Sequence, residues 1–316
     1  MVALEILDPG MMTQLQDTGR TGMGYQGLAQ GGPMDLHAYC WANYLLGNRM
    51  FCSQLEITGG QARFLAHQAI TLALTGADLA TRVNGQPVEG WRTLHLDKGD
   101  TLSFQFPKKG LRAYLAIPGG FAAPTVFGSV ATVVRDGIGG LGARVTKEDS
   151  GCLIRQGDSL KTVSKEVFKP GINRMVPARY IPEYAGPLSL NLMESYQARA
   201  FSAQSRKSLY QTQFTLSPNS DRMGYRLAGA KITPPFSGVI SEGIALGAVQ
   251  IPENGQPIIL MRDHQTLGGY PKFGCVAQLD LNRLAQAMPG TPIRFQPISF
   301  QAAGQKLKSF YSFFNL

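Results

Sequence analysis

The sequence predicts a mainly β protein with two domains of similar size, and three observations favour this fold class. The chain has 316 residues, enough for two domains of about 150 residues each. It contains 37 glycines and 19 prolines, spread along its whole length, as expected for many turns between short strands. The stretch Asn-Gly-Gln-Pro-Val at Asn84 is echoed at Asn254 by Asn-Gly-Gln-Pro-Ile. We therefore expect two β-barrels with few short helices, rather than open sheets.

In chain order, short segments rich in β-branched and aliphatic residues give the expected strands. In the first half they cover residues 55–58, 69–74, 93–96, 101–106 and 111–117. Two dipeptides between them, Asn84-Gly85 and Lys109-Gly110, are typical of hairpin turns. We expect a tight turn at each of these two places.

Three segments are predicted to be helical. Residues 34–46 give the clearest signal, because Pro33 suits a first helical turn and Gly47 suits a C-terminal cap. The other two cover residues 280–288 and 195–201. Between residues 162 and 180, lysines and prolines occur without a strong periodic pattern. We place the border there and predict an N-terminal domain over 1–165 and a C-terminal domain over 166–316.

The composition excludes several classes of protein. The net charge is +9, yet only 16% of the residues are charged, so the excess reflects few acids rather than many bases. The basic residues do not cluster, which argues against nucleic-acid binding. The positive net charge is still compatible with an anionic substrate or partner. The longest apolar run covers five residues, 113–117, too few for a membrane span. The first residues show no secretory signal pattern, so we expect a cytoplasmic protein without a membrane partner.

Cysteines and histidines give no metal motif. The four cysteines are scattered without a CxxC pair, so we expect free thiols, with a Cys40–Cys52 disulfide as the less favoured alternative. No two of the four histidines have the spacing of a zinc site, so no metal is expected. The sequence also lacks a P-loop, a dinucleotide-binding glycine motif and a GxSxG elbow.

Five segments are richer in glycine and polar residues than a turn requires. They are residues 16–25, 31–35, 75–78, 220–227 and 241–271. Each also has a purely structural interpretation; Asp35, for example, suits the first turn of a helix, and Asp221 with Arg222 suits a surface ion pair. The last two segments combine carboxylates, amides and a phenol beside glycines, where a ligand can approach the backbone closely. They favour a small amide-like or ureido ligand.

These blocks resemble the biotin-dependent carboxyltransferase-like family, also called allophanate hydrolase subunit 2-like or KipA-like. The resemblance rests on Gln-Asp-Thr-Gly-Arg at 16–20, Gly-Gly-Pro-Met-Asp at 31–35, Thr-Gly-Ala-Asp at 75–78, Ser-Asp-Arg-Met-Gly-Tyr-Arg-Leu at 220–227 and Gln-Thr-Leu-Gly-Gly-Tyr-Pro at 265–271. It implies two cyclophilin-like β-barrel domains with a site made from segments of both. Gly31 is a departure, because the family often has a serine there.

The resemblance implies a function but leaves alternatives open. The chain has no Met-Lys-Met biotinyl site, so it is more similar to the family's 5-oxoprolinase subunits than to urea carboxylase. A 5-oxoprolinase opens the lactam of 5-oxo-L-proline to L-glutamate at the expense of ATP. Two partners are implied, a subunit 1-like (KipI-like) protein and a LamB/YcsF-like protein, and no tightly bound cofactor is expected in this chain. The alternatives are a biotin-dependent carboxyltransferase acting on urea or a related amide, and a non-enzymatic protein that binds a KipI-like partner.

The resemblance also selects candidate site residues, with the first domain expected to face the second. The catalytic candidates are Asp263 as general base, Arg222 as an anchor for negative charge, and Tyr270 over a planar amide ring. The candidates for substrate binding are Asp35, Asn43, Thr75, Asp78, Tyr114, Ser220, Tyr225, Ser241, Glu242, Gln250, Gln256 and Gln265. The alternative is structural, with Asp221, Arg222 and Asp263 joining the two barrels by ion pairs.

Overall fold

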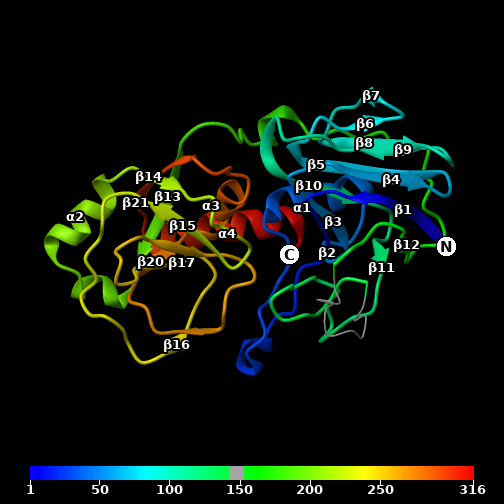
Figure 1. The fold of residues 1–316 in the computed structure, drawn as a ribbon. Helices are drawn as coiled ribbons and strands as arrows, with labels where there is room; N and C mark the ends of the chain where they lie inside the picture. Colours follow the sequence, from blue (N-terminus) through cyan, green and yellow to red (C-terminus); the bar gives the residue numbers. More distant parts are fainter. Residues whose placement is uncertain (142–152) are drawn as a thin grey trace. The chain divides into compact units, whose positions relative to one another are not determined.

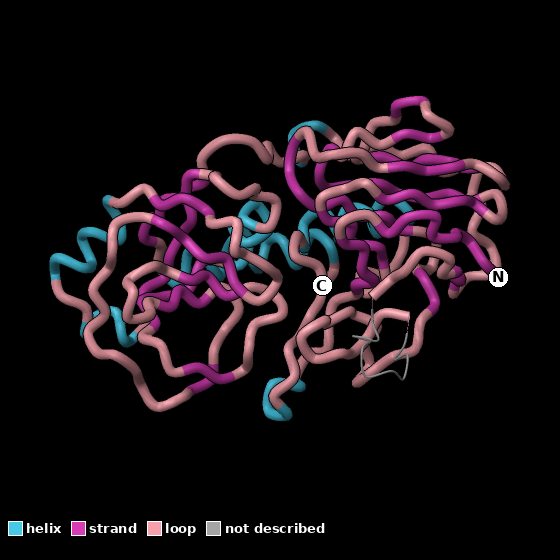
Figure 2. The backbone as a smooth tube through the Cα atoms, viewed as in Figure 1, coloured by secondary structure: helices cyan, strands magenta, loops and turns pink. Residues whose placement is uncertain are grey.

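The computed structural model describes residues 1–141 and 153–316, which are mostly strands joined by turns (Figures 1 and 2). The chain divides into two compact units. The first comprises Met1–Thr21 and Gly31–Tyr184, and the second comprises Gly22–Gln30 and Ala185–Leu316. Four α-helices accompany the strands in the described part of the chain. The predicted mainly β fold class is thereby confirmed.

The first unit contains two sheets, and within its described residues they do not form the single closed barrel expected for this half. The seven-stranded sheet has the order β11 (Phe121–Ala122), β12 (Ser159–Thr162), β1 (Val2–Pro9), β4 (Ala62–Ala66), β9 (Thr101–Ser103), β6 (Arg82–Val83) and β7 (Gln86–Pro87). The five-stranded sheet has the order β2 (Met12–Gln16), β3 (Gln54–Thr58), β10 (Lys109–Ala116), β5 (Ile70–Asp78) and β8 (Arg92–Leu96). Apolar side chains from both sheets form one buried core, which includes Leu4, Phe64, Leu55 and Leu72.

The other face of the five-stranded sheet carries helix α1 (Leu36–Leu46), which packs on β5 and β10. Asp35 caps the helix, because its Oδ1 accepts a hydrogen bond from the backbone N–H of Ala38 at 3.0 Å. Gly47 ends it with a φ of +68°, a conformation that glycine adopts without strain. The helix predicted over residues 34–46 is therefore confirmed from Leu36 onward, whereas Pro33 lies before the cap rather than in the first turn.

The segment after residue 165 belongs to the first unit. The backbone N–H of Thr71 in β5 donates to the carbonyl of Val167, and that of Thr93 in β8 donates to the carbonyl of Arg174. The predicted border at 165/166 therefore lies inside this unit, which extends to Tyr184. The weak periodicity of this stretch suggests a linker, but its backbone hydrogen bonds go to the neighbouring strands.

The second unit is built on a closed barrel. Its strand order is β13 (Leu188–Glu194), β20 (Lys272–Val276), β17 (Ala248–Gln250), β18 (Ile258–Leu260), β15 (Gly224–Ala228), β14 (Phe214–Leu216) and β21 (Pro292–Pro297). The barrel closes because β21 pairs with β14 on one side and, in parallel, with β13 on the other. Two short strands, β16 (Glu242–Gly243) and β19 (Leu267–Gly268), pair with each other outside the barrel.

Five further helices belong to this unit. They are the 3₁₀ helices η1 (Met23–Gln26) and η3 (Tyr196–Ala200), and the α-helices α2 (Ala203–Gln211), α3 (Gln278–Leu284) and α4 (Phe300–Phe314). A further 3₁₀ helix, η2 (Ala178–Tyr180), lies in the first unit. Of the predicted helices, residues 280–288 correspond to α3, and residues 195–201 form the 3₁₀ helix η3. Helices α2 and α4 were not predicted, although serines at 202 and 299 cap them.

One of the two predicted hairpin turns is confirmed and one is wrong. Asn84 and Gly85, with φ of +50° and +81°, connect β6 to β7 as expected. Lys109-Gly110 instead begins strand β10, where Lys109 pairs with Asp78 and the register then shifts before Ala113. Gly110 has a φ of +76°, so this glycine marks an irregularity within a strand rather than a hairpin turn.

Two further sequence expectations concern thiols and membranes. Cys40, Cys52 and Cys275 are free, so the disulfide considered between the first two is not formed. Cys152 lies outside the described residues. Within residues 1–141 and 153–316, no helix has the length and apolar character needed to cross a bilayer.

Candidate functional site

A buried row of polar side chains crosses the five-stranded sheet of the first unit beneath α1. The strand register places Gln14, Glu56, Tyr114 and Thr75 side by side on β2, β3, β10 and β5. Each of them is at most 1% exposed. Neighbouring residues such as Leu55 point to the opposite, apolar face, because side chains alternate along a strand. Folding therefore places a carboxylate, a phenol and an amide together inside the protein.

Glu56 is the centre of this row. Its Oε2 accepts hydrogen bonds from the Tyr114 hydroxyl at 2.7 Å and from the backbone N–H of Met34 at 2.8 Å. The Arg112 guanidinium lies 3.7 Å from its Oε1 and is 5% exposed. Burial, followed by the negative charge of Glu56, raises the pKa of Tyr114 well above its ordinary value of 10.0, so the phenol stays protonated and donates.

Most of the candidate residues in the first unit form hydrogen bonds that hold helix α1 on the five-stranded sheet. The Asp35 backbone N–H donates to the Tyr114 hydroxyl at 2.7 Å, and its Oδ2 accepts from Tyr184 at 2.8 Å. Thr75 donates to the carbonyl of Ala38 at 2.7 Å. Asn43 ties the helix to the following loop by donating to the carbonyl of Cys52 at 3.1 Å. Asp78 is the exception among these candidates, since it is exposed and its carboxylate accepts from the backbone of Ala80.

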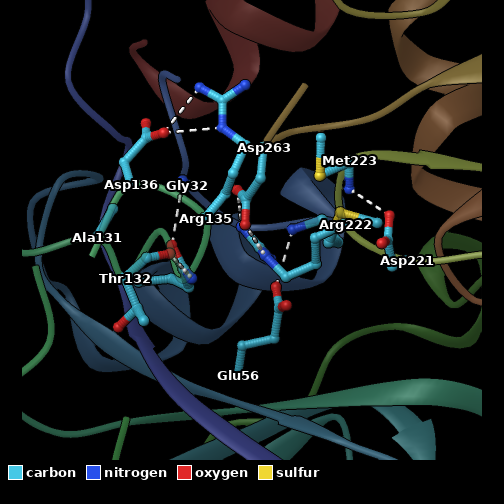
Figure 3. Close-up of polar contacts among 12 residues, drawn as sticks. Gly32, Glu56, Ala131, Thr132, Arg135, Asp136, Asp221, Arg222, Met223 and Asp263 are labelled. Carbon is cyan, nitrogen blue, oxygen red and sulfur yellow. Dashed lines mark hydrogen bonds and ion pairs between the residues drawn. The ribbon is translucent and has the colours of Figure 1, made fainter. Parts of the chain in front are cut away.

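In the second unit, Arg222 and Asp263 form a buried bidentate ion pair (Figure 3). Arg222 Nε lies 2.8 Å from Oδ2 of Asp263, and its Nη2 lies 2.9 Å from Oδ1. The two side chains are 6% and 5% exposed. Asp221 does not share this pair: its Oδ1 accepts from the backbone N–H groups of Met223 and Gly224. Both Asp263 oxygens are thus engaged by one guanidinium, which favours a role in holding two loops together over the predicted role as general base.

A second cluster of the same unit surrounds Lys272, at the start of β20. Its Nζ lies 2.5 Å from Oε1 of Glu242 and donates to the carbonyl of Gly243 at 3.3 Å. Glu242 also accepts from the Tyr196 hydroxyl and from Nε2 of Gln197, both at 2.5 Å. The bond to Lys272, and then that to Tyr196, lowers the pKa of Glu242 below its ordinary value of 4.5. Glu242 is therefore a fixed anion that positions the ammonium group.

Gln250 completes this cluster from β17. It pairs directly with Lys272 of β20, because the register shifts by one residue after Val249. This bulge leaves Phe273 without a counterpart on β17 and brings the lysine opposite the glutamine. Gln250 is 1% exposed, and its Nε2 has no hydrogen-bond partner among the described residues. The cluster thus combines an ammonium group with a buried amide donor, both suited to an oxygen of a ligand.

The remaining candidates of the second unit do not join either cluster. Tyr270 is 45% exposed, and Ser241 is exposed. Gln256 bonds both backbone groups of Gly229, and Ser220 accepts from the backbone N–H of Arg226. Tyr225 is buried, with its hydroxyl 3.5 Å from the carbonyl of Ala285, and the carbonyl of Gln265 contacts the ring of His264 at 2.7 Å. The expectation that first-domain candidates face second-domain candidates stays a prediction.

Several residues of these clusters are not among the candidates predicted from the sequence, namely Gln14, Glu56, Arg112, Tyr196, Gln197 and Lys272. One signal was present for Glu56: in Gln-Leu-Glu-Ile-Thr at 54–58, the acid alternates with apolar residues and so lies on the face opposite the core. No comparable signal marks Lys272, because a bulge in the strand pairing decides which residue it meets. Among the described residues, no group of three or more His, Cys, Asp or Glu side chains is placed to hold a metal ion.

The Glu242–Lys272 contact predicts a pH-dependent contribution to stability. Because folding lowers the pKa of Glu242, the contact stabilises the protein at pH values above 4.5 and is lost as the pH falls through the lower folded pKa. Glu242→Gln should therefore unfold at lower urea concentration than the wild type at pH 7, and the gap should narrow towards pH 3. Glu253→Gln, on an exposed loop, is the control. An equal gap at both pH values would contradict this prediction.

The two sheets of the first unit and the closed barrel of the second unit together define the class of fold to which this chain belongs. A crystal structure of the urea carboxylase of Kluyveromyces lactis matches with a TM-score of 0.88 and 27% identity, over 98% of this chain and 28% of that one. Residues 26–297 match the family described as "Carboxyltransferase domain, subdomain A and B". The chain belongs to this family.

Two curated bacterial relatives, both C subunits of a 5-oxoprolinase, are similar over nearly their whole length. The relative from Escherichia coli is 36% identical over 305 residues, which cover 95% of this chain and 93% of that protein. The relative from Haemophilus influenzae is 33% identical, over 96% and 93% of the two chains. The urea amidolyase of Lachancea kluyveri is more distant, at 28% identity, and this chain covers 17% of it.

Proposed function

We propose that this chain is a subunit of an ATP-dependent 5-oxoprolinase, which opens 5-oxo-L-proline to L-glutamate together with partner subunits. The observation that carries the proposal is the similarity to two bacterial 5-oxoprolinase subunits over 93% of their length, at 36% and 33% identity. The proposed partners are a KipI-like and a LamB/YcsF-like protein, with ATP as a co-substrate of the complex in the cytoplasm.

The chemistry of the Lys272 cluster supports the same proposal. A lactam carbonyl carbon is a poor electrophile, and phosphorylation of its oxygen by ATP activates the carbon for attack by water. Such a reaction needs hydrogen-bond donors around the oxygen on which negative charge develops. Lys272 Nζ and Gln250 Nε2 are donors of this kind on one stretch of the barrel wall.

The proposal is tested by reconstitution. The purified chain, mixed with its two partner proteins, 5-oxo-L-proline and ATP, should release glutamate and ADP in equal amounts, whereas the chain alone should release neither. Glutamate is measured by a coupled dehydrogenase assay, and ADP by chromatography. ADP release that does not depend on 5-oxo-L-proline, or the absence of glutamate from the complete mixture, would contradict the proposal.

A second candidate function, biotin-dependent carboxyl transfer to urea or a related amide, is favoured by the TM-score of 0.88 to a urea carboxylase. It is tested in the same preparation by supplying carboxybiotin and urea and measuring the loss of carboxybiotin. Carboxybiotin consumption that depends on urea, together with no glutamate release from 5-oxo-L-proline, would decide for this candidate. A non-enzymatic role would leave both assays negative while the KipI-like partner still binds.

A further inference from the structure

The buried amide of Gln250 is the starting observation. Its Nε2 is shielded from solvent and has no hydrogen-bond partner in the described part of the chain, although the side chain is 1% exposed. Most buried polar groups in folded proteins are hydrogen-bonded, and an exception calls for an explanation, such as a bound water or a ligand. On the neighbouring strand, Lys272 lies directly opposite and donates to Glu242 and to the carbonyl of Gly243. An ammonium group has three protons, so one of its donors remains.

The two-stranded ribbon β16–β19 lies over this amide. A Cβ atom added to Gly268 would lie 3.0 Å from Gln250 Nε2 and 2.4 Å from Cδ1 of Ile244. The backbone of Gly268 therefore lies close to the amide, and a side chain at this position would crowd it. Each strand of the ribbon has two residues, and within the described residues the two strands pair with each other rather than with the barrel (Figure 2). The ribbon is thus a separate small element.

Two neighbouring residues of β16 contact the barrel through Lys272: Glu242 by its carboxylate and Gly243 by its carbonyl. Glu242 also accepts from Tyr196 and Gln197 on η3. The ribbon's own hydrogen bonds run between its two strands, as from Ile244 to the carbonyl of Thr266. The glycine at 268 allows the ribbon backbone to approach Gln250 and Ile244 closely. Loss of the Lys272 ammonium group would remove the ribbon's ion pair with the barrel and leave Glu242 only its hydrogen bonds to η3, which loosens the ribbon without disturbing the barrel strands.

We propose that the β16–β19 ribbon is a lid, latched by Glu242 on Lys272, and that its opening admits an amide or lactam whose carbonyl oxygen is then bound by Gln250 Nε2 and Lys272 Nζ. The identity of this substrate rests on the proposed function, whereas the lid and its latch do not. Binding supplies the acceptor that Gln250 lacks in the closed protein. It also accounts for the presence of an amide donor at a buried position.

The latch is tested by hydrogen exchange, which needs no activity. In the full chain, Lys272→Met should accelerate amide exchange at least fivefold in peptides covering residues 240–246 and 265–270, with the barrel strand β13 unchanged. Lys207→Met, on the exposed face of α2, is the matched control and should leave all of these peptides at the wild-type rate. Wild-type exchange rates of the ribbon in Lys272→Met would overturn the lid.

The donor is tested in the reconstituted complex with Gln250→Leu. Because the buried amide donor has no hydrogen bond to lose, this variant should melt at or above the wild-type temperature, while kcat/KM for 5-oxo-L-proline should fall at least tenfold. Gln211→Leu, at an exposed position of α2, is the control for activity. If Gln250→Leu does not fold, Gln250→Met replaces it in the same assay. Unchanged kcat/KM in a folded variant would overturn the donor assignment, while glutamate release by the wild-type complex would still support the proposed function.

Absence of turnover in the wild-type complex would contradict the proposed function and, with it, the lactam as the ligand. The hydrogen-exchange result would then still decide whether the ribbon is a lid. The two failures are therefore distinguishable.

Discussion

Arg222→Ala is expected to lower the free energy of unfolding of the second unit by about 3–5 kcal/mol, because it leaves the Asp263 carboxylate buried without its guanidinium. Both bonds of the pair, at 2.8 and 2.9 Å, would be lost, and the side chain of Asp263 is only 5% exposed. The loss is measured by urea unfolding of the full chain at pH 7, followed by far-ultraviolet circular dichroism.

Two further variants complete this experiment. Arg226→Ala removes an exposed arginine from the same strand region and should change the free energy of unfolding by less than about 0.5 kcal/mol. The double variant Arg222→Met with Asp263→Leu removes both charges and should recover part of the loss. A melting temperature equal to the wild type in Arg222→Ala, with activity abolished, would instead support the predicted role of Arg222 as a substrate anchor.

Glu56→Leu is expected to have a comparable effect on the first unit, about 3–5 kcal/mol, for a related reason. The substitution removes the acceptor of the Tyr114 hydroxyl and of the Met34 backbone N–H, and it leaves the nearby Arg112 charge buried. Calorimetry or urea unfolding measures the loss of stability. The near-ultraviolet circular dichroism of the buried tyrosines reports whether the packing around Tyr114 changes.

The controls for Glu56 separate charge from packing. Glu89→Leu changes an exposed acid of the same unit and should be close to neutral. Glu56→Leu combined with Arg112→Leu should be more stable than Glu56→Leu alone, because the buried guanidinium charge is then removed together with the carboxylate. Equal stabilities of the single and double variants would show that the Arg112 charge is compensated by other groups.

Local patterns in the sequence were sufficient where neighbouring residues decide the structure. The mainly β class follows from short apolar segments between glycine and proline turns, and the C-terminal end of α1 follows from Gly47. The Asn84-Gly85 turn follows from the positive φ angles that these residues tolerate. Polar blocks such as residues 220–227 and 241–271 were also recognisable, because they carry more fixed polar groups than a turn needs.

Distant pairing decided the rest. The sequence predicted the β-rich halves and the segments that are rich in polar residues, since composition, alternation and turn residues are properties of neighbouring positions. Only the tertiary structure decided that Gly85 lies in a hairpin turn whereas Gly110 lies in a strand. It also decided that Arg222 meets Asp263 and that Lys272 meets Gln250. The contact between Lys272 and Gln250 depends on the register of two paired strands. A shift of one residue in that pairing would exchange every side-chain contact along the strand.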